Sequence, residues 1–173
     1  MLKILPTLLK QRVAYHMLRS AKVQERPKKG VNLRGSSQII LVYTETDEKK
    51  FKLVKDIAVY LKKEYDIKRV MRLAFIQGEK KDVPTWHMRK LESDFFCSSD
   101  LNWYDKPVKH VQAHLSQPYD ILMHLDPDKA AALDFFVTAS QARMKVANFS
   151  ANRPQDFDIL IPPKANDSWK QRN

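Results

Sequence analysis

The chain has 173 residues, 43% of them hydrophobic, and carries a formal net charge of +11. This hydrophobic share excludes a chain that is disordered by composition, and the length fits one domain with an appendage. The single cysteine excludes an intramolecular disulfide, and no apolar run approaches the roughly 18 residues that span a bilayer, so we expect a cytoplasmic protein.

The positive charge is concentrated in an N-terminal arm. Residues 1–34 hold nine Lys or Arg and one acid, Glu25, which gives +8. Residues 35–173 hold 22 basic and 19 acidic residues, which gives only +3. A basic arm on a nearly balanced domain favours polyanionic partners, meaning RNA, DNA or an anionic membrane surface.

Within the arm, Pro6 suits a first helical turn and apolar residues recur at a spacing of four. These apolar residues are Leu9, Val13 and Met17. The spacing predicts a basic amphipathic helix over residues 6–24, within an N-terminal unit of residues 1–24. Pro, Gly and Ser residues then predict a linker over residues 25–37.

From residue 38 onward, short apolar runs alternate with segments of helical periodicity. The apolar runs predict strands over residues 38–43, 69–76, 94–98, 119–125, 145–149 and 157–162. The periodic segments predict helices over residues 47–65, 85–93, 106–117 and 126–142, with Asp47 and Asp126 as N-caps. The alternation predicts an α/β domain over residues 38–173, built on a Rossmann-like, doubly wound, mostly parallel sheet of five to six strands in the order 3-2-1-4-5-6.

In that topology, ligands bind beyond the carboxyl ends of the strands, where the first and fourth strands part. The loops there, residues 44–50 and 126–129, contain no glycine, although a bound phosphate needs closely approached backbone N–H groups. We therefore expect no nucleotide cofactor. The acids in these loops include Asp47, Asp126 and Asp128, which are candidate Mg²⁺ ligands. Capping is the favoured role for Asp47 and Asp126, so we expect no metal site.

The histidines and the cysteine offer little catalytic chemistry. His110 and His114 share a helix face at a spacing that can begin a zinc site, but no local motif supplies further ligands, so a solvated helix face is favoured. His124 and Cys97 lie in apolar strands and are expected to be core residues. We predict no catalytic residues and no enzymatic activity.

The stretch "DLNWYDKPVKH", residues 100–110, places a tryptophan in a polar turn. Asp100 has the chemistry of an Asx turn, Asn102 tolerates left-handed backbone, and Pro107 is expected to start the next helix. This interpretation makes Trp103 a buried plug on the edge of the sheet. The alternative is a surface for single-stranded RNA, in which rings and charges act together: Trp103, Tyr104, Lys106 and Lys109.

Two resemblances follow from these segments. "YDILMHLDPDKAAALDFFVTASQARMKVANFS", residues 119–150, resembles a βαβ unit in the N-terminal half of heptosyltransferase-type glycosyltransferases. More broadly, the basic N-terminal helix, the "DFF" strand, the "DLNW…KP" turn and the "YDIL" strand resemble a family of small uncharacterised Bacteroidetes proteins, a domain of unknown function. That resemblance implies a fold and a compartment but no activity.

These patterns predict a non-enzymatic cytoplasmic binding module that associates with RNA or the ribosome through its arm. The candidate nucleic-acid-binding residues are Lys3, Lys10, Arg12, Arg19, Lys22, Arg26, Lys28, Lys29, Arg34, Trp103 and Lys106. Three alternatives stay open. They are a peripheral membrane protein anchored by residues 6–24, a reduced glycosyltransferase-like domain, and a helix that packs on its own sheet while its charges only solubilise it.

Overall fold

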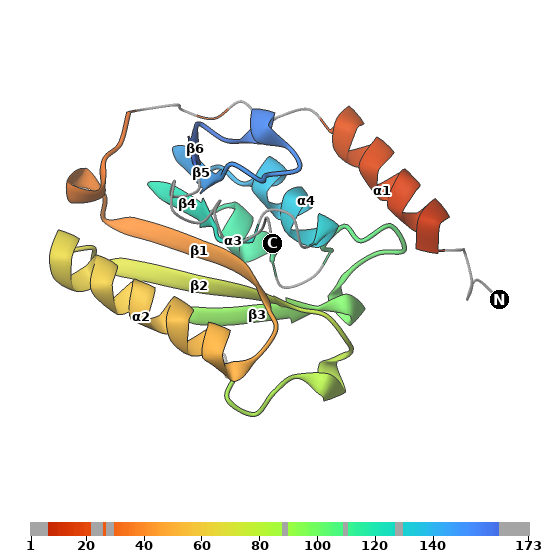
Figure 1. Cartoon of the computed structure of the whole chain (residues 1–173), viewed down its shortest axis with the longest axis horizontal. Coiled ribbons are helices and arrows are strands. Elements are labelled where there is room, and N and C mark those ends of the chain that lie inside the picture. The colour runs from red at the N-terminus through yellow and green to blue at the C-terminus, as the bar shows by residue number, and fades with distance from the viewer. Residues whose placement is uncertain are drawn as a thin grey trace, which may run out of the picture.

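Six strands form one sheet in the computed structural model, which describes residues 7–21, 26, 30–87, 90–108, 111–126 and 130–162. The strands are β1 (Gln38–Glu45), β2 (Arg69–Ile76), β3 (Ser93–Cys97), β4 (Ile121–His124), β5 (Met144–Asn148) and β6 (Ile159–Ile161). All neighbours pair in parallel, in the order β3-β2-β1-β4-β5-β6 (Figure 1). The predicted Rossmann-like sheet and its strand order are confirmed.

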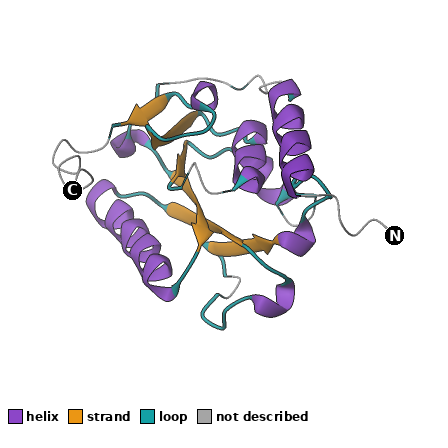
Figure 2. Ribbon diagram, turned by 45° about the vertical axis from the view of Figure 1, so that its right-hand side comes forward, coloured by secondary structure: helices purple, strands orange, loops and turns teal. Residues whose placement is uncertain are grey.

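Helices cover both faces of this sheet (Figure 2). They are α1 (Thr7–Ser20), α2 (Glu48–Tyr65), α3 (Gln112–Leu115) and α4 (Ala131–Ala139). Because side chains alternate along a strand, Ile39 and Leu41 of β1 pack with α2, whereas Ile40 and Val42 pack with α4. β1 is therefore buried on both faces, as its apolar, β-branched sequence predicts.

The helices between the later strands are shorter than predicted. Residues 85–87 and 90–93 form turns and a bridge, with no helix among them. Pro107 does not start a helix, because it pairs with Leu101 in an isolated bridge, and α3 begins only at Gln112. The last helix begins at Ala131 with Ala130 as its N-cap, so the predicted cap role of Asp126 is wrong.

The helix α1 packs on α4 through a different face from the predicted one. Ala14 and Leu18 are buried against Phe135. In contrast, Leu9 and Met17, which belong to the predicted apolar face, are 43% and 40% exposed. The periodicity located the helix, but the ring of Phe135 decides which of its faces is buried.

Arg26 ties the segment that follows α1 to the edge of the sheet. Its Nη2 donates to both carboxylate oxygens of Asp158, at 2.8 and 2.7 Å. Its Nη1 donates to the carbonyl oxygens of Ala142, at 3.0 Å, and Arg143, at 2.7 Å. The basic arm therefore contacts the α/β domain, although its division into helix, linker and domain stays a prediction.

Among the described residues, no helix has the length and hydropathy needed to cross a bilayer.

We expect Leu18→Ala to lower the free energy of unfolding by about 2–4 kcal/mol, because it removes the buried methyl groups that pack against Phe135 and leaves a cavity. Leu9→Ala, on the exposed face of the same helix, is the matched control and should change stability by less than about 0.5 kcal/mol. Urea denaturation of both variants measures the difference. Equal and small effects would mean that α1 does not dock on α4 in solution.

Candidate nucleic-acid interface

The turn that carries Trp103 is held by the side chain of Asn102. Its Oδ1 accepts hydrogen bonds from the backbone N–H groups of Tyr104, at 3.1 Å, and Lys106, at 2.9 Å. The left-handed residue is Asp105, with a φ of 67°. The expected roles were therefore misplaced: Asn102 makes the Asx turn, while Asp100 accepts from the backbone N–H of Cys97 at 3.0 Å.

The two aromatic rings of this turn have opposite environments. Trp103 is 57% exposed, so the prediction that it is a buried plug is wrong. Tyr104 takes that position instead, with its ring centroid 5.9 Å from that of Phe135. The rings of Trp103 and Tyr104 contact edge to face, with their centroids 5.3 Å apart, so the half-buried ring supports the exposed one.

The fold brings this turn beside the basic helix α1. The ammonium group of Lys10 lies 2.6 Å from the Oδ1 atom of Asp105. Tyr104 joins the same cluster as Ala14 and Leu18 of α1. The turn that carries Trp103 and Lys106 therefore adjoins the helix that carries Lys10, Arg12 and Arg19.

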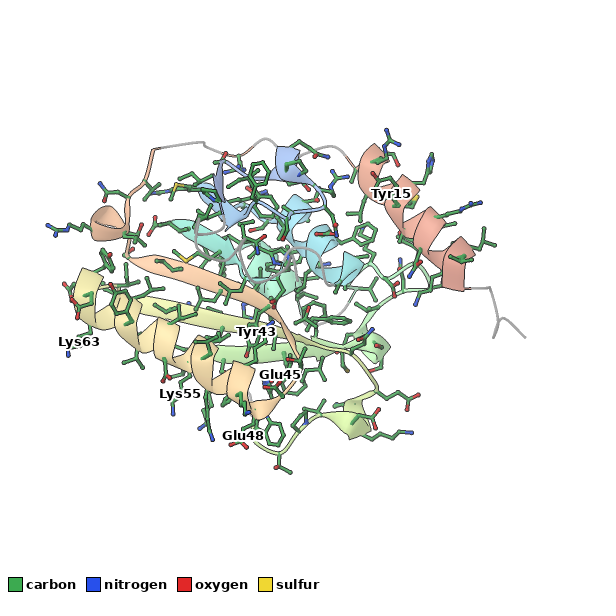
Figure 3. All side chains as sticks on the ribbon, in the orientation of Figure 1. Tyr15, Tyr43, Glu45, Glu48, Lys55 and Lys63 are labelled. Carbon is green, nitrogen blue, oxygen red and sulfur yellow. The ribbon has the colours of Figure 1, made fainter. Side chains whose placement is uncertain are left out.

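The exposed face of α1 adds a ring that the sequence analysis missed. Tyr15 is 53% exposed, and the guanidinium carbon of Arg19 lies 5.7 Å from its ring centroid. Arg12 is exposed on the same helix. Figure 3 shows Tyr15 on α1, far from Lys55 and Lys63 on α2. Exposed rings and cations thus occur together on both α1 and the Trp103 turn.

Two hollows flank the turn along α4. The first, which we name the α1 pocket, has a volume of about 380 Å³ and is lined by Tyr15, Asp105, Asp134, Asn152 and Arg153, among others. The second, the α3 groove, has a volume of about 620 Å³. Its lining includes Lys106, Gln112, Ala139 and Arg143. Because the first residues of α4 line the α1 pocket and Ala139 lines the α3 groove, the two hollows lie at opposite ends of that helix.

A buried carboxyl group lines the α1 pocket. Burial raises the pKa of Asp134 to about 7, although Asn152 and Arg153 act in the opposite direction. The Arg153 guanidinium is engaged by Asp156, with Nε–Oδ2 and Nη2–Oδ1 distances of 2.7 and 3.2 Å. Asp156 also accepts from the Thr138 hydroxyl at 2.6 Å. The only sequence signal for Asp134 is a lone acid inside the apolar run "AAALDFFV".

A second polar cluster lies at the carboxyl end of β1. The Nε2 atom of His87 is 2.7 Å from Oε2 of Glu45, and both side chains are buried. The rings of Phe51 and Phe95 contact the imidazole edge to face, with centroid distances of 5.0 and 5.7 Å. Figure 3 shows Glu45 near Tyr43, whose pKa is raised by burial and by the Glu45 carboxylate. Enclosed in this way, the pair ties the β2–β3 loop, which carries His87, to the end of β1.

The acids of the predicted switch point serve the fold. Asp47 caps α2 as predicted, because its Oδ1 accepts from the backbone N–H of Lys50 at 2.9 Å. Asp126 accepts from the backbone N–H of Thr44 at 3.0 Å and pairs with the Lys50 ammonium group. Asp128 lies outside the described residues. Within the described part of the chain, no three His, Cys, Asp or Glu residues gather to hold a metal.

Two further histidines, His114 and His124, and Cys97 are buried. His114 hydrogen-bonds to Asp94 at 2.9 Å and Tyr119 at 3.2 Å, so its predicted place on a solvated face is wrong. His124 and Cys97 are buried as expected. His110 lies outside the described residues.

The other candidate binding residues divide into two groups. Arg26 is engaged with Asp158, and Arg34 is exposed in a short 3₁₀ helix (Leu33–Gly35) that precedes β1. The rest lie outside the described residues: Lys3, Lys22, Lys28, Lys29 and Lys109. Arg143, which the sequence analysis missed, joins Lys106 in the α3 groove.

Comparison with known proteins identifies one family. The model of a family described as "Family of unknown function (DUF6913)" matches residues 10–171. No curated protein and no solved structure matches the chain.

Asp134 should make stability depend on pH. Its pKa is about 7 in the folded chain against an ordinary value of 3.8, so its protonated form contributes stability that is complete below pH 3.8 and lost as the pH rises through 7. Asp134→Asn cannot ionise. We therefore expect the stability of the wild type relative to this variant to fall between pH 4 and pH 7 and to level off above pH 8. Chemical denaturation at each pH measures this difference, and a constant difference would contradict it.

Proposed function

This chain belongs to the family of unknown function DUF6913, and we propose that it is a non-enzymatic module that binds single-stranded RNA along the α4 side of its sheet. The observation that carries the proposal is the exposed ring of Trp103, which stands beside the basic helix α1. An exposed tryptophan next to cations matches the way in which single strands are bound, by base stacking and phosphate contacts.

The path for the strand follows α4. Lys106 lines the α3 groove and supplies positive charge for phosphates, whereas the guanidinium of Arg143 in the same groove is paired with Asp120 at 3.2 Å. Trp103 precedes Lys106 in the turn and supplies a stacking surface. Arg12 and Arg19 continue the positive charge along α1. The turn adjoins the helix, because Tyr104 packs against Ala14 and Leu18 and Asp105 pairs with Lys10.

The switch point of the sheet is filled by contacts within the chain, which favours a partner bound elsewhere over a catalytic site there. In open α/β sheets this crevice is the usual ligand site. Here Asp126 of the β4–α4 loop bonds to Thr44 and pairs with Lys50, so the chain's own groups bridge the place where β1 and β4 part. The proposal therefore places the partner on α4 and α1, and it places the protein in the cytoplasm, in contact with ribosomal RNA. A Bacteroidetes origin and the glycosyltransferase resemblance stay expectations from the sequence.

An anionic membrane is the second candidate partner, because Leu8 is 73% exposed near the start of α1. An interfacial helix inserts a continuous apolar face into lipid. In α1 the apolar residues Ala14 and Leu18 instead pack on Phe135, and the outward face mixes leucines with Arg12 and Arg19. Trp103 and Lys106 also have no part in a helical anchor. These observations favour RNA.

We expect Trp103→Ala to weaken binding of a single-stranded oligonucleotide by about 1–3 kcal/mol, or about 5- to 150-fold, while the melting temperature stays within a degree or two. Tyr104→Ala is the contrasting variant: loss of its contact with Phe135 should destabilise the fold by about 2 kcal/mol. Fluorescence anisotropy and thermal melting of both variants provide the test. Unchanged affinity in Trp103→Ala would remove the main support for this function.

The charges of α1 should govern the salt dependence of binding. The double variant Arg12→Ala/Arg19→Ala loses two phosphate contacts, and each is worth about 0.7 in the slope of log K against log salt for a single strand. We expect the slope to become shallower by about 1.4. Lys55→Ala/Lys63→Ala removes the same charge from α2, on the opposite face of the sheet, and should leave the slope unchanged (Figure 3).

Vesicle flotation with the same two double variants separates RNA from membrane. We expect the wild-type protein to float weakly with anionic vesicles and to bind RNA tightly. If the protein floats strongly, Leu8→Ser abolishes flotation and no oligonucleotide binds, then α1 is a membrane helix and the RNA proposal fails.

A further inference from the structure

The α1 pocket lies beyond the carboxyl ends of the strands, at the edge of the sheet on which open α/β folds bind ligands. Ala130 and Ala131, which follow β4, line one wall, and Asn152 and Arg153, which follow β5, line another. The helix α1 closes the third side. This pocket is therefore at the carboxyl edge of the sheet, one strand away from the switch point. Its volume of about 380 Å³ falls in the range of small-ligand sites, about 300–1,000 Å³.

The charges of this pocket disfavour a phosphate and favour a ligand with N–H donors. Arg153 is already paired with Asp156, so its charge is balanced within the chain. The pocket also holds two carboxylates: Asp105 is paired with Lys10, and Asp134 interacts with the Asn152 side chain and with Arg153. Burying a carboxylate is costly unless donors meet it. A flat neutral ring with two adjacent N–H groups would add two donors to the one that Asn152 gives Asp134.

The rim of the pocket offers a stacking surface. Tyr15 lines it with a ring that is 53% exposed. The Asn152 side chain, which interacts with Asp134, lies at the same opening and is exposed. Bases that leave a strand are bound in this way, between an aromatic ring and hydrogen bonds to the Watson–Crick edge.

We propose that the α1 pocket receives one guanine base of the bound RNA, stacked on Tyr15 and hydrogen-bonded through N1–H and N2–H to the two oxygens of Asp134. Guanine alone among the four bases has two adjacent donors on its Watson–Crick edge, whereas adenine presents an acceptor at N1. This inference rests on the proposed function and adds a preferred base to it. Trp103 and Lys106 bind any strand, and Asp134 selects among strands.

The test uses three uridine oligonucleotides that differ at one central position, which is guanine, inosine or adenine. Inosine keeps N1–H and lacks the N2 amine, so it removes one of the two proposed bonds. We expect the wild type to bind the guanine strand about 10-fold more tightly than the inosine strand, within the discrimination of a bidentate contact. Asp134→Asn should lower affinity for the guanine strand to that for the inosine strand.

Two further variants keep this test decisive. Tyr15→Ala changes an exposed side chain, so it should fold normally and weaken binding of the guanine strand by at least fivefold. Lys55→Ala/Lys63→Ala, on the far face of the sheet, should preserve both the affinity and the preference for guanine. Thermal melting of each variant confirms that the fold is retained. A guanine preference that survives in folded Asp134→Asn overturns the inference.

Free guanosine separates this inference from the function on which it rests. If oligonucleotides bind with no preference for guanine, the pocket inference fails and the RNA function stands. If no oligonucleotide binds but guanosine shifts the NMR signals of Tyr15 and Asn152 and inosine does not, the RNA function fails and the guanine pocket stands. If neither guanosine nor any strand binds, both are overturned.

Discussion

Burial of β1 on both faces is the constraint on which the rest of the molecule depends. Residues 39–43 are fully buried, so each must meet apolar groups either from α2 or from α4. A central strand of this kind can present a ligand only with its carboxyl end. That end is occupied by internal contacts, because Glu45 faces His87 and the backbone of Thr44 bonds to Asp126. The binding groups that we propose lie elsewhere, on the helices and on the turns beside them.

Phe135 links the core to the proposed binding surface. Its ring contacts Ala14 and Leu18 of α1, and its centroid is 5.9 Å from that of Tyr104 in the turn. One side chain thus holds two segments that are separated by more than eighty residues. Tyr104 and Leu18 pack against Phe135, and their sequence neighbours Trp103 and Arg19 are exposed. In each segment, one residue therefore stabilises the fold and the next is available for the proposed binding.

The α1 pocket depends on groups that the chain brings together from four places. Tyr15 comes from α1, Asp105 from the turn, Asp134 from α4, and Arg153 from the segment after β5. The charge of Arg153 is balanced by its ion pair with Asp156. Burial, in contrast, raises the pKa of Asp134. In the proposed binding mode, Asp134 is the group of this pocket that meets the base, beside the ring of Tyr15.

The sequence by itself determined the class of the fold, the strand order and the strand positions to within a few residues, because period-two and period-3.6 patterns and short connections are local properties. It also determined the N-cap role of Asp47 and the basic arm. Only the tertiary structure decided which face of α1 is buried, that Tyr104 rather than Trp103 packs inward, and that Asp126 bonds across to β1. Each of these depends on a partner distant in the chain, such as Phe135 or Thr44, and no local pattern encodes which side chain will meet it.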